Sequence, residues 1–468
     1  MKSKLLITTT IIFIANVCFG KNLSLDEAIQ MALSQNKESL AAAESVESSS
    51  YEAKASYGRL LPQLSLEGKY TVLNDPITLD VNDIRTAMIS SSVAAATYSG
   101  AAAANISALK ATLNRSLPSF NMEVQEKSYA NLSAIVTQPL FTGGKIWANI
   151  NAKKEELNIS QQANKNTRNK IITETVTNYF RVQLLKALTS IRTELVKDLE
   201  EHVSHADKLL KQGMISKANK MRADVALAEA QREEFKAKKD LDLSYILLAN
   251  TLGSTFKDFE LTSSMFTSKV KNLEDYTQKG LEQNPNLAIL EHKSKQLDEK
   301  YVATRANFLP TIAAFGKYEI YKDNLTLFEP EWAVGIMMKL NLFEGGSDYN
   351  SLQSVNSQKM ALRYITENAR ELVQTEIQKY YHDLKTAEEQ LRSLESSRAM
   401  AEENLRLNRL SFDQGVATSL EVIDAELALG KVKTEQSKAL YDFDVALVNL
   451  LRSSGDSYDI IQLAKEMP

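Results

Sequence analysis

Cysteine, proline and glycine are scarce in this 468-residue chain, which contains 1 Cys, 8 Pro and 16 Gly. With Cys18 as the only cysteine, no disulfide can form within the chain. Few glycines and prolines indicate long uninterrupted elements rather than many loops. A net charge of −4 gives no signal for nucleic-acid binding, because phosphate contacts need a basic surface. Beyond the N-terminus, no stretch reaches the roughly 20 apolar residues of a membrane-spanning helix.

Catalytic and cofactor motifs are also missing from the sequence. The run from Phe141 to Lys145 is too short for a phosphate-binding loop. His202 and His205 stand three residues apart on a predicted helix, but no second cluster supports a metal site. Carboxylates are abundant, yet no cleft can be argued around a pair of them. The sequence therefore predicts no enzyme, no cofactor and no metal.

The first 20 residues have the layout of a secretory signal peptide. Two lysines precede the apolar run 5–17, and the small residue Gly20 follows. Cleavage after Gly20 would remove Cys18 and leave a mature chain without cysteine. Lipid attachment at Cys18 is the alternative, although Val17 stands where a small residue normally precedes a lipidated cysteine. We therefore expect residues 1–20 to direct export.

The remainder of the chain contains an internal repeat, and repeats dictate architecture. The segment around Pro62 recurs around Pro310, at an offset of 248 residues. The Leu-Phe-x-Gly-Gly block recurs at an offset of 202 residues. The Gln-Gly pair recurs at the same offset, so that Gly213 corresponds to Gly415. The difference between the two offsets predicts an insertion of 46 residues in the first copy only.

Four segments alternate between apolar and polar side chains, which is the pattern of strands with two different faces. They cover residues 64–73, 130–137, 312–320 and 332–339, two in each copy. Phe315 is the one misfit on a polar side. The apolar side holds ten residues that we expect to face lipid, namely Leu64, Leu66, Tyr70, Leu132, Val136, Ile312, Tyr318, Trp332, Val334 and Ile336.

Export, a strand length of about 10 residues and aromatic residues near the strand ends favour a membrane β-barrel over a soluble sandwich. Four strands cannot close a barrel, and an open sheet edge cannot survive in lipid. Several copies of the chain must therefore share one barrel. Two copies would supply eight strands and three would supply twelve, and the strand pattern alone does not choose between them.

Two stretches without Pro or Gly, 145–211 and 347–413, predict unusually long helices. At about 1.5 Å per residue, each would reach roughly 100 Å. Gly213 and Gly415 follow them and the helical pattern then resumes, so each copy contains a long helical hairpin. The apolar spacing is that of a coiled coil, as in Ile377, Tyr380, Leu384, Ala387, Leu391 and Leu394.

Shorter helices are predicted before the first strand of each copy, at 25–57 and 273–307. The insertion, about 74–121, is rich in alanine and predicts helix. It is either an outer lid over the barrel mouth or a surface loop. The predicted organisation is a signal peptide at 1–20, a first repeat at 21–250, an equatorial linker at 251–272, a second repeat at 273–451 and a C-terminal tail at 452–468.

This order of elements, used twice, resembles the TolC-like outer membrane factor family. The resemblance covers nearly the whole mature chain. Its motifs are Leu-Pro before the first strands, Thr137-Gln138-Pro139-Leu140-Phe141 with Gly143-Gly144, and the run from Gly415 to Ala425. It implies an α+β membrane protein, a homotrimer with a twelve-stranded barrel in the outer membrane of a Gram-negative bacterium, continued by an α-helical coiled-coil tunnel through the periplasm. It also implies a periplasmic adaptor and an inner-membrane pump as partners.

The resemblance assigns roles to particular residues. Pro139 would help to swing strand into helix, whereas the second copy has Asn341 there. The hairpin tips would form the periplasmic mouth of the tunnel and dock the adaptor. The tip residues are Gly213, Met214, Gly415 and Val416.

Just beyond the second tip, Glu421 and Asp424 stand at i, i+3 and share a helix face. They match acidic rings that constrict the family's tunnel. Repeated threefold, close carboxylates would repel one another, favour cations and raise their own pKa values. The alternative is an ordinary solvated helix face. The family's tip salt bridge would fall on Asn219 and Ala417, neither of which is charged, so closure would rest on other bonds.

The predicted function is the exit duct of a tripartite efflux system, which conducts small molecules such as drugs and toxic compounds passively. The same duct in a type I protein secretion system is the close alternative. A periplasmic coiled-coil scaffold without a pore is a third hypothesis, which the alternation in all four strands disfavours. Such a duct contributes little selectivity, so the sequence identifies neither the substrate nor the class of pump.

Overall fold

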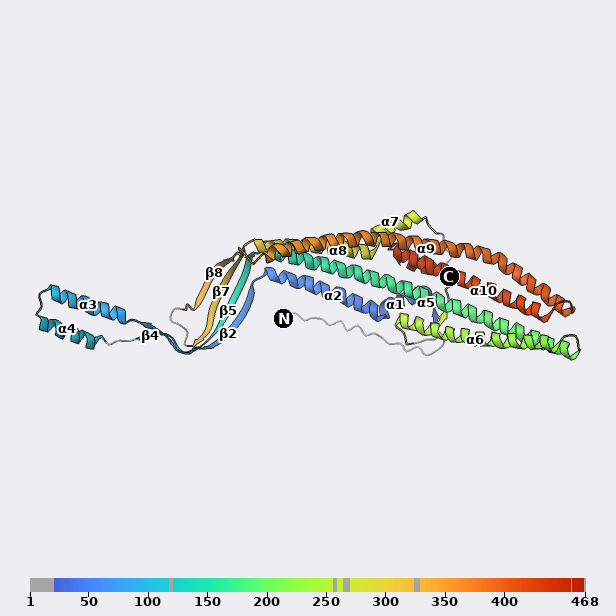
Figure 1. Cartoon of the computed structure of the whole chain (residues 1–468), viewed down its shortest axis with the longest axis horizontal. Coiled ribbons are helices and arrows are strands. Elements are labelled where there is room, and N and C mark those ends of the chain that lie inside the picture. The colour runs from blue at the N-terminus through green and yellow to red at the C-terminus, as the bar shows by residue number, and fades with distance from the viewer. Residues whose placement is uncertain are drawn as a thin grey trace, which may run out of the picture. The chain divides into compact units, whose positions relative to one another are not determined.

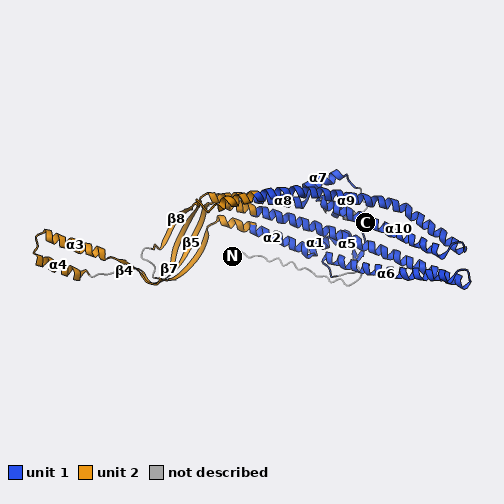
Figure 2. Ribbon diagram, viewed as in Figure 1, with its two compact units in different colours: residues 1–52, 153–297, 357–468 blue, residues 53–152, 298–356 orange. Residues whose placement is uncertain are grey.

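The computed structural model describes residues 21–117, 121–255, 259–263, 270–323, 329–455 and 457–466. The predicted signal peptide lies outside the described residues. The chain forms two compact units, each assembled from distant segments (Figure 2). The first unit comprises residues 1–52, 153–297 and 357–468, and the second comprises 53–152 and 298–356. Both units draw on both repeats, so the predicted division into repeats stays a prediction.

A four-stranded antiparallel sheet lies in the second unit (Figure 1). Its order is β2 (Gln63–Val72), β5 (Ser128–Phe141), β7 (Thr311–Asp323) and β8 (Trp332–Lys339). The four predicted strands are confirmed, and β5 and β7 are longer than expected, at 14 and 13 residues. The alternation of apolar and polar residues predicted these strands correctly because successive residues of a strand point to opposite faces.

The insertion of the first copy folds into a small appendage between β2 and β5. A two-stranded ribbon, β3 (Ile77–Asp80) with β4 (Asn121–Gln125), carries two helices, α3 (Asn82–Tyr98) and α4 (Ala103–Ser116). The helix prediction for this alanine-rich segment is confirmed. Neither helix has a side-chain N-cap, so their stability comes from packing against each other.

The long helices agree with the sequence prediction residue for residue. They are α5 (Lys145–Lys211) and α9 (Ser347–Asp413), of 67 residues each. After each comes a returning helix, α6 (Lys217–Leu252) or α10 (Ser419–Ser453). Each long helix begins just after a Gly-Gly pair with positive φ, which only glycine adopts at low cost.

The prediction of one continuous helix before each first strand is wrong. The structure has two in each place, α1 (Leu25–Gln35) and α2 (Lys37–Tyr57), then α7 (Leu273–Gln283) and α8 (Pro285–Arg305). The break falls at Asn36 and at Asn284, which have extended ψ values of 128° and 122°. Asparagine side chains compete for backbone hydrogen bonds and so favour such breaks.

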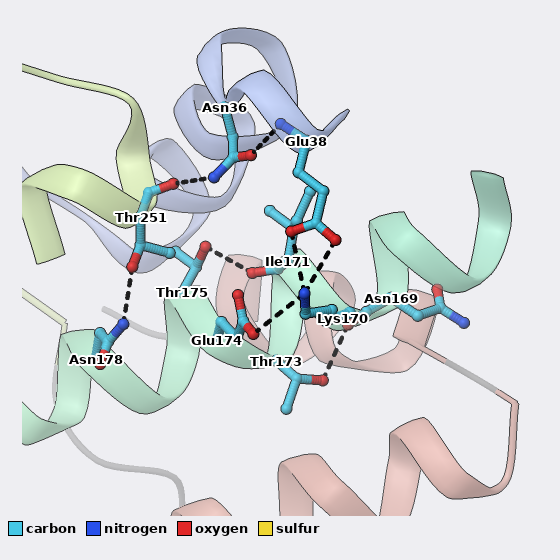
Figure 3. A network of polar contacts seen from close by, with 10 residues as sticks. All are labelled: Asn36, Glu38, Asn169, Lys170, Ile171, Thr173, Glu174, Thr175, Asn178 and Thr251. Atoms are coloured by element: carbon cyan, nitrogen blue, oxygen red, sulfur yellow. Dashed lines mark hydrogen bonds and ion pairs between the residues drawn. The ribbon is translucent and has the colours of Figure 1, made fainter. Parts of the chain in front are cut away.

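At the first break, Asn36 connects three chain segments (Figure 3). Its Nδ2 donates to the Thr251 carbonyl at 2.9 Å, and its Oδ1 accepts from the Glu38 N–H at 2.8 Å. Asn178 of α5 donates to the Thr251 hydroxyl at 2.8 Å, and Lys170 pairs with Glu38 at 2.9 Å. The chain turn at 35–37 is therefore tied to α5 and to the end of α6.

The second break repeats this arrangement. Asn284 donates to the Ser453 carbonyl at 3.1 Å and accepts from the Asn286 N–H at 2.9 Å. In each copy a glycine with positive φ completes the contact, Gly253 in the first and Gly455 in the second. A Cβ at either glycine would lie 2.7 Å from the backbone of the break. We call these two sites the equatorial joints.

The linker contains a strand that the sequence pattern did not predict. β6 (Phe259–Leu261) pairs in parallel with β1 (Lys21–Leu23). The buried Tyr179 holds this pair, because its hydroxyl donates to the Leu23 carbonyl at 2.8 Å and accepts from the Ser263 N–H at 3.0 Å. The predicted C-terminal tail contains a further helix, α11 (Ser457–Glu466).

The main hydrophobic core of the first unit lies around the β1–β6 pair. Tyr179 and Phe180 are fully buried there in edge-to-face contact at 5.7 Å. Ile377, Leu384 and Ala387 of the predicted coiled-coil seam lie in the same core, with Tyr380 and Leu391 partly buried against it. A smaller core lies nearer the hairpin tips and joins α5, α6 and α10 through residues such as Leu199, Ala223 and Ile423.

Candidate functional site

One face of the four-stranded sheet is a continuous apolar surface. Cross-strand register places Leu66, Ala134, Tyr318 and Trp332 in one row. The ten predicted lipid-facing residues all fall on this face, and several are strongly exposed, for example Val334 at 73%. A large exposed apolar patch marks a surface that meets a partner or a membrane.

The opposite face is polar and internally bonded. Glu319 is buried there and accepts hydrogen bonds from Ser133 at 2.9 Å and from Asn131 at 3.4 Å. Lys317 forms ion pairs with Glu319 and with Glu329. The sheet therefore has one apolar face and one polar face that is suited to contact with water.

Phe315 lies on the polar face, where the register also places Ile135 and Met337, and its position has a local explanation. It pairs across the strands with Gly335, and a Cβ at Gly335 would lie 2.9 Å from the phenyl ring. The ring therefore covers the bare backbone of the neighbouring strand, a recognised compensation for glycine in a sheet.

The edges of the sheet are incomplete. Within the described residues, β2 and β8 each pair on one side only. An edge strand exposes a row of unpaired N–H and C=O groups, which lipid cannot satisfy. A single chain therefore cannot place this sheet in a membrane by itself.

Pro139 lies near the end of β5, where the β5–β7 register shifts between Pro139 and Phe141. The chain then turns through Gly143 into α5, and a Cβ at Gly143 would lie 3.0 Å from Leu309. In the second copy Asn341 instead donates to Glu344 at 2.6 Å. The two strand-to-helix turns thus differ in their side-chain contacts, and the swivel role of Pro139 stays a prediction.

The predicted tip residues lie in two turns with the same backbone. Gly213 and Gly415 both have φ of 72°, and a Cβ at either would meet open space among the described residues. Met214 and Val416 follow them and are exposed at 61% and 80%. The tips therefore present apolar side chains to solvent, which suits contact with a partner.

The structure gives Glu421 and Asp424 different surroundings, although both are exposed. Glu421 completes a capping box, because its carboxylate accepts from the Thr418 N–H at 2.6 Å and from the Thr418 hydroxyl at 2.9 Å. These bonds lower the pKa of the Glu421 carboxyl within a single chain. The predicted rise in pKa concerns neighbouring copies and stays a prediction.

A polar cluster joins the two helical hairpins just above the tips, and the sequence analysis missed it. Arg409 of α9 pairs with Asp198 of α5 at 2.9 Å and with Glu426 of α10 at 3.1 Å. Glu426 is 3% exposed, and its Oε2 has no hydrogen-bond partner among the described residues. Burial raises the pKa of Glu426 to about 7, although Arg409 opposes the shift.

The two histidines belong to the same cluster. His202 is buried, and its Nε2 lies 2.6 Å from the Ser419 hydroxyl of α10. Burial lowers the pKa of His202 to about 4, assisted by His205 and Arg409. His205 faces Asp413 at 3.5 Å, and Phe412 packs against both imidazoles. These contacts could not be predicted from spacing, because their partners are about 200 residues away in the chain.

The described part of the chain contains no helix that is both long and apolar enough to cross a membrane. It also contains no group of three His, Cys, Asp or Glu placed to hold a metal ion.

Comparison with known sequences decides the family. The pattern of the outer membrane efflux protein family matches residues 28–254 and 277–456, which is most of the chain. The chain belongs to the outer membrane efflux protein family.

Individual relatives of this efflux protein family agree with that assignment. The chain is 26% identical over 257 residues to the alkaline protease secretion protein AprF of Pseudomonas aeruginosa, covering 52% of this chain and 53% of AprF. It is 22% identical over 247 residues to the outer membrane protein TolC of Vibrio cholerae, covering 50% of this chain and 56% of TolC. The chain thus spans about half the length of the curated relatives it matches.

The fold of the efflux protein family is shared over nearly the whole chain. The outer membrane channel CmeC of Campylobacter jejuni superposes with a TM-score of 0.73 at 16% identity, covering 96% of this chain and 93% of CmeC. The predicted fold class is therefore confirmed. At this identity the likeness establishes the fold alone.

Proposed function

We propose that the protein is a passive outer-membrane exit duct of a tripartite efflux system. The observation that carries the proposal is the four-stranded sheet, with one apolar face and two unpaired edges, on a chain that also forms two 67-residue helices. Paired edge to edge, copies of the sheet would form a closed barrel with its apolar face toward lipid. The long helices would form a tunnel on the periplasmic side.

Three copies would supply a twelve-stranded barrel, the number that the family resemblance implies. The exposed tips around Met214 and Val416 would meet a periplasmic adaptor, which in turn connects to an inner-membrane pump. Small molecules would pass through without any chemical step, so the protein would not be an enzyme. Residues Glu421 and Asp424 would constrict the tunnel near the tips.

A duct for a type I protein secretion system is the second candidate. It is favoured by the sequence likeness to AprF, whose name describes protease secretion. The two candidates differ in the adaptor that the tips would bind. Deleting the gene and measuring both drug susceptibility and exported protein would separate them.

The duct itself can be tested by fractionation and electrophysiology. We expect heat-modifiable trimers in the outer-membrane fraction and discrete conductance steps after reconstitution into planar bilayers. Protein found only in the soluble periplasmic fraction, as monomer, would refute the proposal.

The gate is best tested with Glu421→Gln and Asp424→Asn together. Glutamine at position 421 retains the capping bonds to Thr418, so the pair of substitutions removes charge without removing the cap. We expect conductance to rise or cation selectivity to fall, because the repelling carboxylates have gone. Charge removal on another helix, as in Glu229→Gln with Glu233→Gln on α6, is the matched control. Equal current and selectivity in both proteins would eliminate the gate role.

A further inference from the structure

The α3–α4 appendage contains one helix with two apolar stripes. The first stripe of α3 packs against α4 and includes Ile89, which is 6% exposed, with Val93 and Ala96 partly buried. The second stripe lies on the other side of α3, at spacings of four, three, four and three residues. Its members, which we call the outer stripe, are the apolar or aromatic Ile84, Met88, Ala95 and Tyr98 together with the small uncharged Ser91.

The outer stripe is exposed in the single chain. Ile84, Met88 and Tyr98 are 64%, 56% and 98% exposed. Alternating spacings of three and four residues place these side chains within one narrow band of the helix, as in a coiled-coil seam. A helix with apolar stripes on two sides is normally buried on both, so the outer stripe lacks the partner that its pattern suits.

Charge distinguishes the outer stripe from the outer surface of α4. No charged residue occurs between Thr86 and Leu109, whereas α4 carries Lys110 and Arg115. Arg85, the nearest charge on α3, donates to the Leu117 carbonyl and to Asn114 and so turns toward α4. An uncharged helix face favours close approach of an identical uncharged face over contact with a charged partner.

The position of the appendage in the chain favours a second copy of this chain as the occupant. The β3–β4 ribbon follows directly from the paired strands β2 and β5, and the Leu73 N–H donates to the Lys127 carbonyl at the junction. Each copy that contributes four strands to a shared barrel therefore also brings one appendage to the same end of it. Closed symmetry would then repeat the outer stripe around the axis.

We propose that the outer stripe of α3 packs against the α3 helix of a neighbouring copy, so that the appendages form an uncharged helical cap over the external mouth of the duct. This inference rests on the proposed function, because it needs several copies around one barrel. It gives the insertion a role that is separate from the gate at the hairpin tips.

Cysteine cross-linking tests the contact directly. The only native cysteine is Cys18, so in a Cys18→Ser background an introduced cysteine stands alone. We expect Met88→Cys to give on the order of tenfold more disulfide-linked dimer on intact cells than Ala111→Cys, because a disulfide needs Cα atoms within about 7 Å. Ala111 is exposed on α4, away from α3, and is the matched control. Ser91→Cys provides a second position on the outer stripe.

Trimers that conduct normally, but that cross-link equally at positions 88, 91 and 111 or at none of them, would overturn the cap and leave the duct intact. Absence of both trimers and conductance would instead remove the proposed function, and the cap with it. A second measurement uses Met88→Glu in the Ser91→Cys background. Charges on facing stripes repel, so we expect the position-91 cross-link to be lost while the trimer persists; an unchanged cross-link would contradict the proposal.

Discussion

The two hairpin tips share the same backbone turn but differ in the charge of the residues that follow it. In both, φ of the glycine is 72°, and the next N–H closes the turn on a carbonyl five residues back at 2.9 Å, from Met214 to Leu209 and from Val416 to Ser411. The first residues after the turns differ in charge. At an offset of 202, Asn219 corresponds to Glu421 and Arg222 corresponds to Asp424.

This comparison distinguishes the residues that the turn requires from the surface side chains that can vary between the two copies. A left-handed glycine and a hydroxyl N-cap, Ser216 or Thr418, are needed to reverse a helix, and both copies retain them. Side chains that point away from the turn are free to change. The reversal of the helix therefore does not require charge at the second tip, although the Glu421 carboxylate also completes the capping box there.

The equatorial joints show the opposite behaviour, because their contacts are nearly identical. Each joint combines an asparagine that breaks a helix with a glycine that lies against its backbone. The joint glycines have φ values of 69° and 81°, similar to those of the tips, but they have no room for a side chain. Joint and tip therefore make a matched pair for mutation.

The largest expected effect is that of Gly253→Ala. A Cβ there would lie 2.7 Å from the Gln35 carbonyl oxygen, so backbone must move in addition to adopting a strained φ. We expect a loss of about 2–5 kcal/mol in the free energy of unfolding, the sum of left-handed strain and overpacking. Gly213→Ala, with the same kind of φ and open space, should lose only about 1–2 kcal/mol. Urea titration of detergent-purified trimers would measure both, and equal losses would show that the joint is not tightly packed.

A change of pH is expected to have an intermediate effect on the packing of the two hairpins, through the polar cluster that joins them. The pKa of Glu426 is raised from 4.5 to about 7, so protonation stabilises the packed state as the pH falls from about 7 to 4.5. The pKa of His202 is lowered from 6.5 to about 4, so protonation destabilises the packed state as the pH falls from 6.5 to 4. The two contributions oppose each other between pH 4.5 and 6.5, and the wild-type packing should change little there.

Single substitutions should expose each contribution, up to about 3 kcal/mol at 1.36 kcal/mol per pKa unit. In Glu426→Gln the hairpins should separate as the pH falls below 6.5, because the destabilising protonation of His202 is then unopposed by Glu426. In His202→Gln they should pack more firmly as the pH falls from 7 to 4.5. Distances between spin labels on α5 and α10 would report both changes. Identical pH profiles in the two variants would contradict opposed titrations.

The smallest expected effect compares the two N-caps. Ser216→Ala removes one hydrogen bond, to the Asn219 N–H, and should cost about 1 kcal/mol. Thr418→Ala also removes the hydroxyl that bonds to the Glu421 carboxylate, so its cost should be somewhat larger. Hydrogen exchange in the first turns of α6 and α10 would measure the local loss. A larger loss at Ser216 would show that the capping box adds nothing.

The periodicity of apolar residues and the positions of glycine and proline were sufficient to predict the strands, the long helices and the turns between them. The bounds of α5 and α9 follow from flanking glycines, and the register of the sheet follows from alternation. The breaks at Asn36 and Asn284 were missed because asparagine is tolerated inside helices, and the close approach of Gly253 and Gly455 to the breaks leaves no local signal. The repeat of all four residues was nevertheless visible in the sequence, at offsets of 248 and 202.

Long-range polar contacts were beyond the sequence for a different reason. Arg409, Asp198 and Glu426 lie on three helices, and no local pattern states which side chains will meet after two hairpins pack. The assignment of Glu421 is a partial case. Its spacing from Thr418 is a capping-box signature, so its structural bond could have been recognised beside the predicted gate role.

The pairing of β1 with β6 has a consequence for the order in which the protein is made. The Leu25 N–H bonds to the Ser263 hydroxyl, 238 residues further along the chain. Synthesis proceeds from the N-terminus, so the first strand must wait until more than half of the polypeptide has emerged. Contacts of such long range also form slowly. The N-terminal segment should therefore be among the last parts to become protected from protease, even though it is the first to appear.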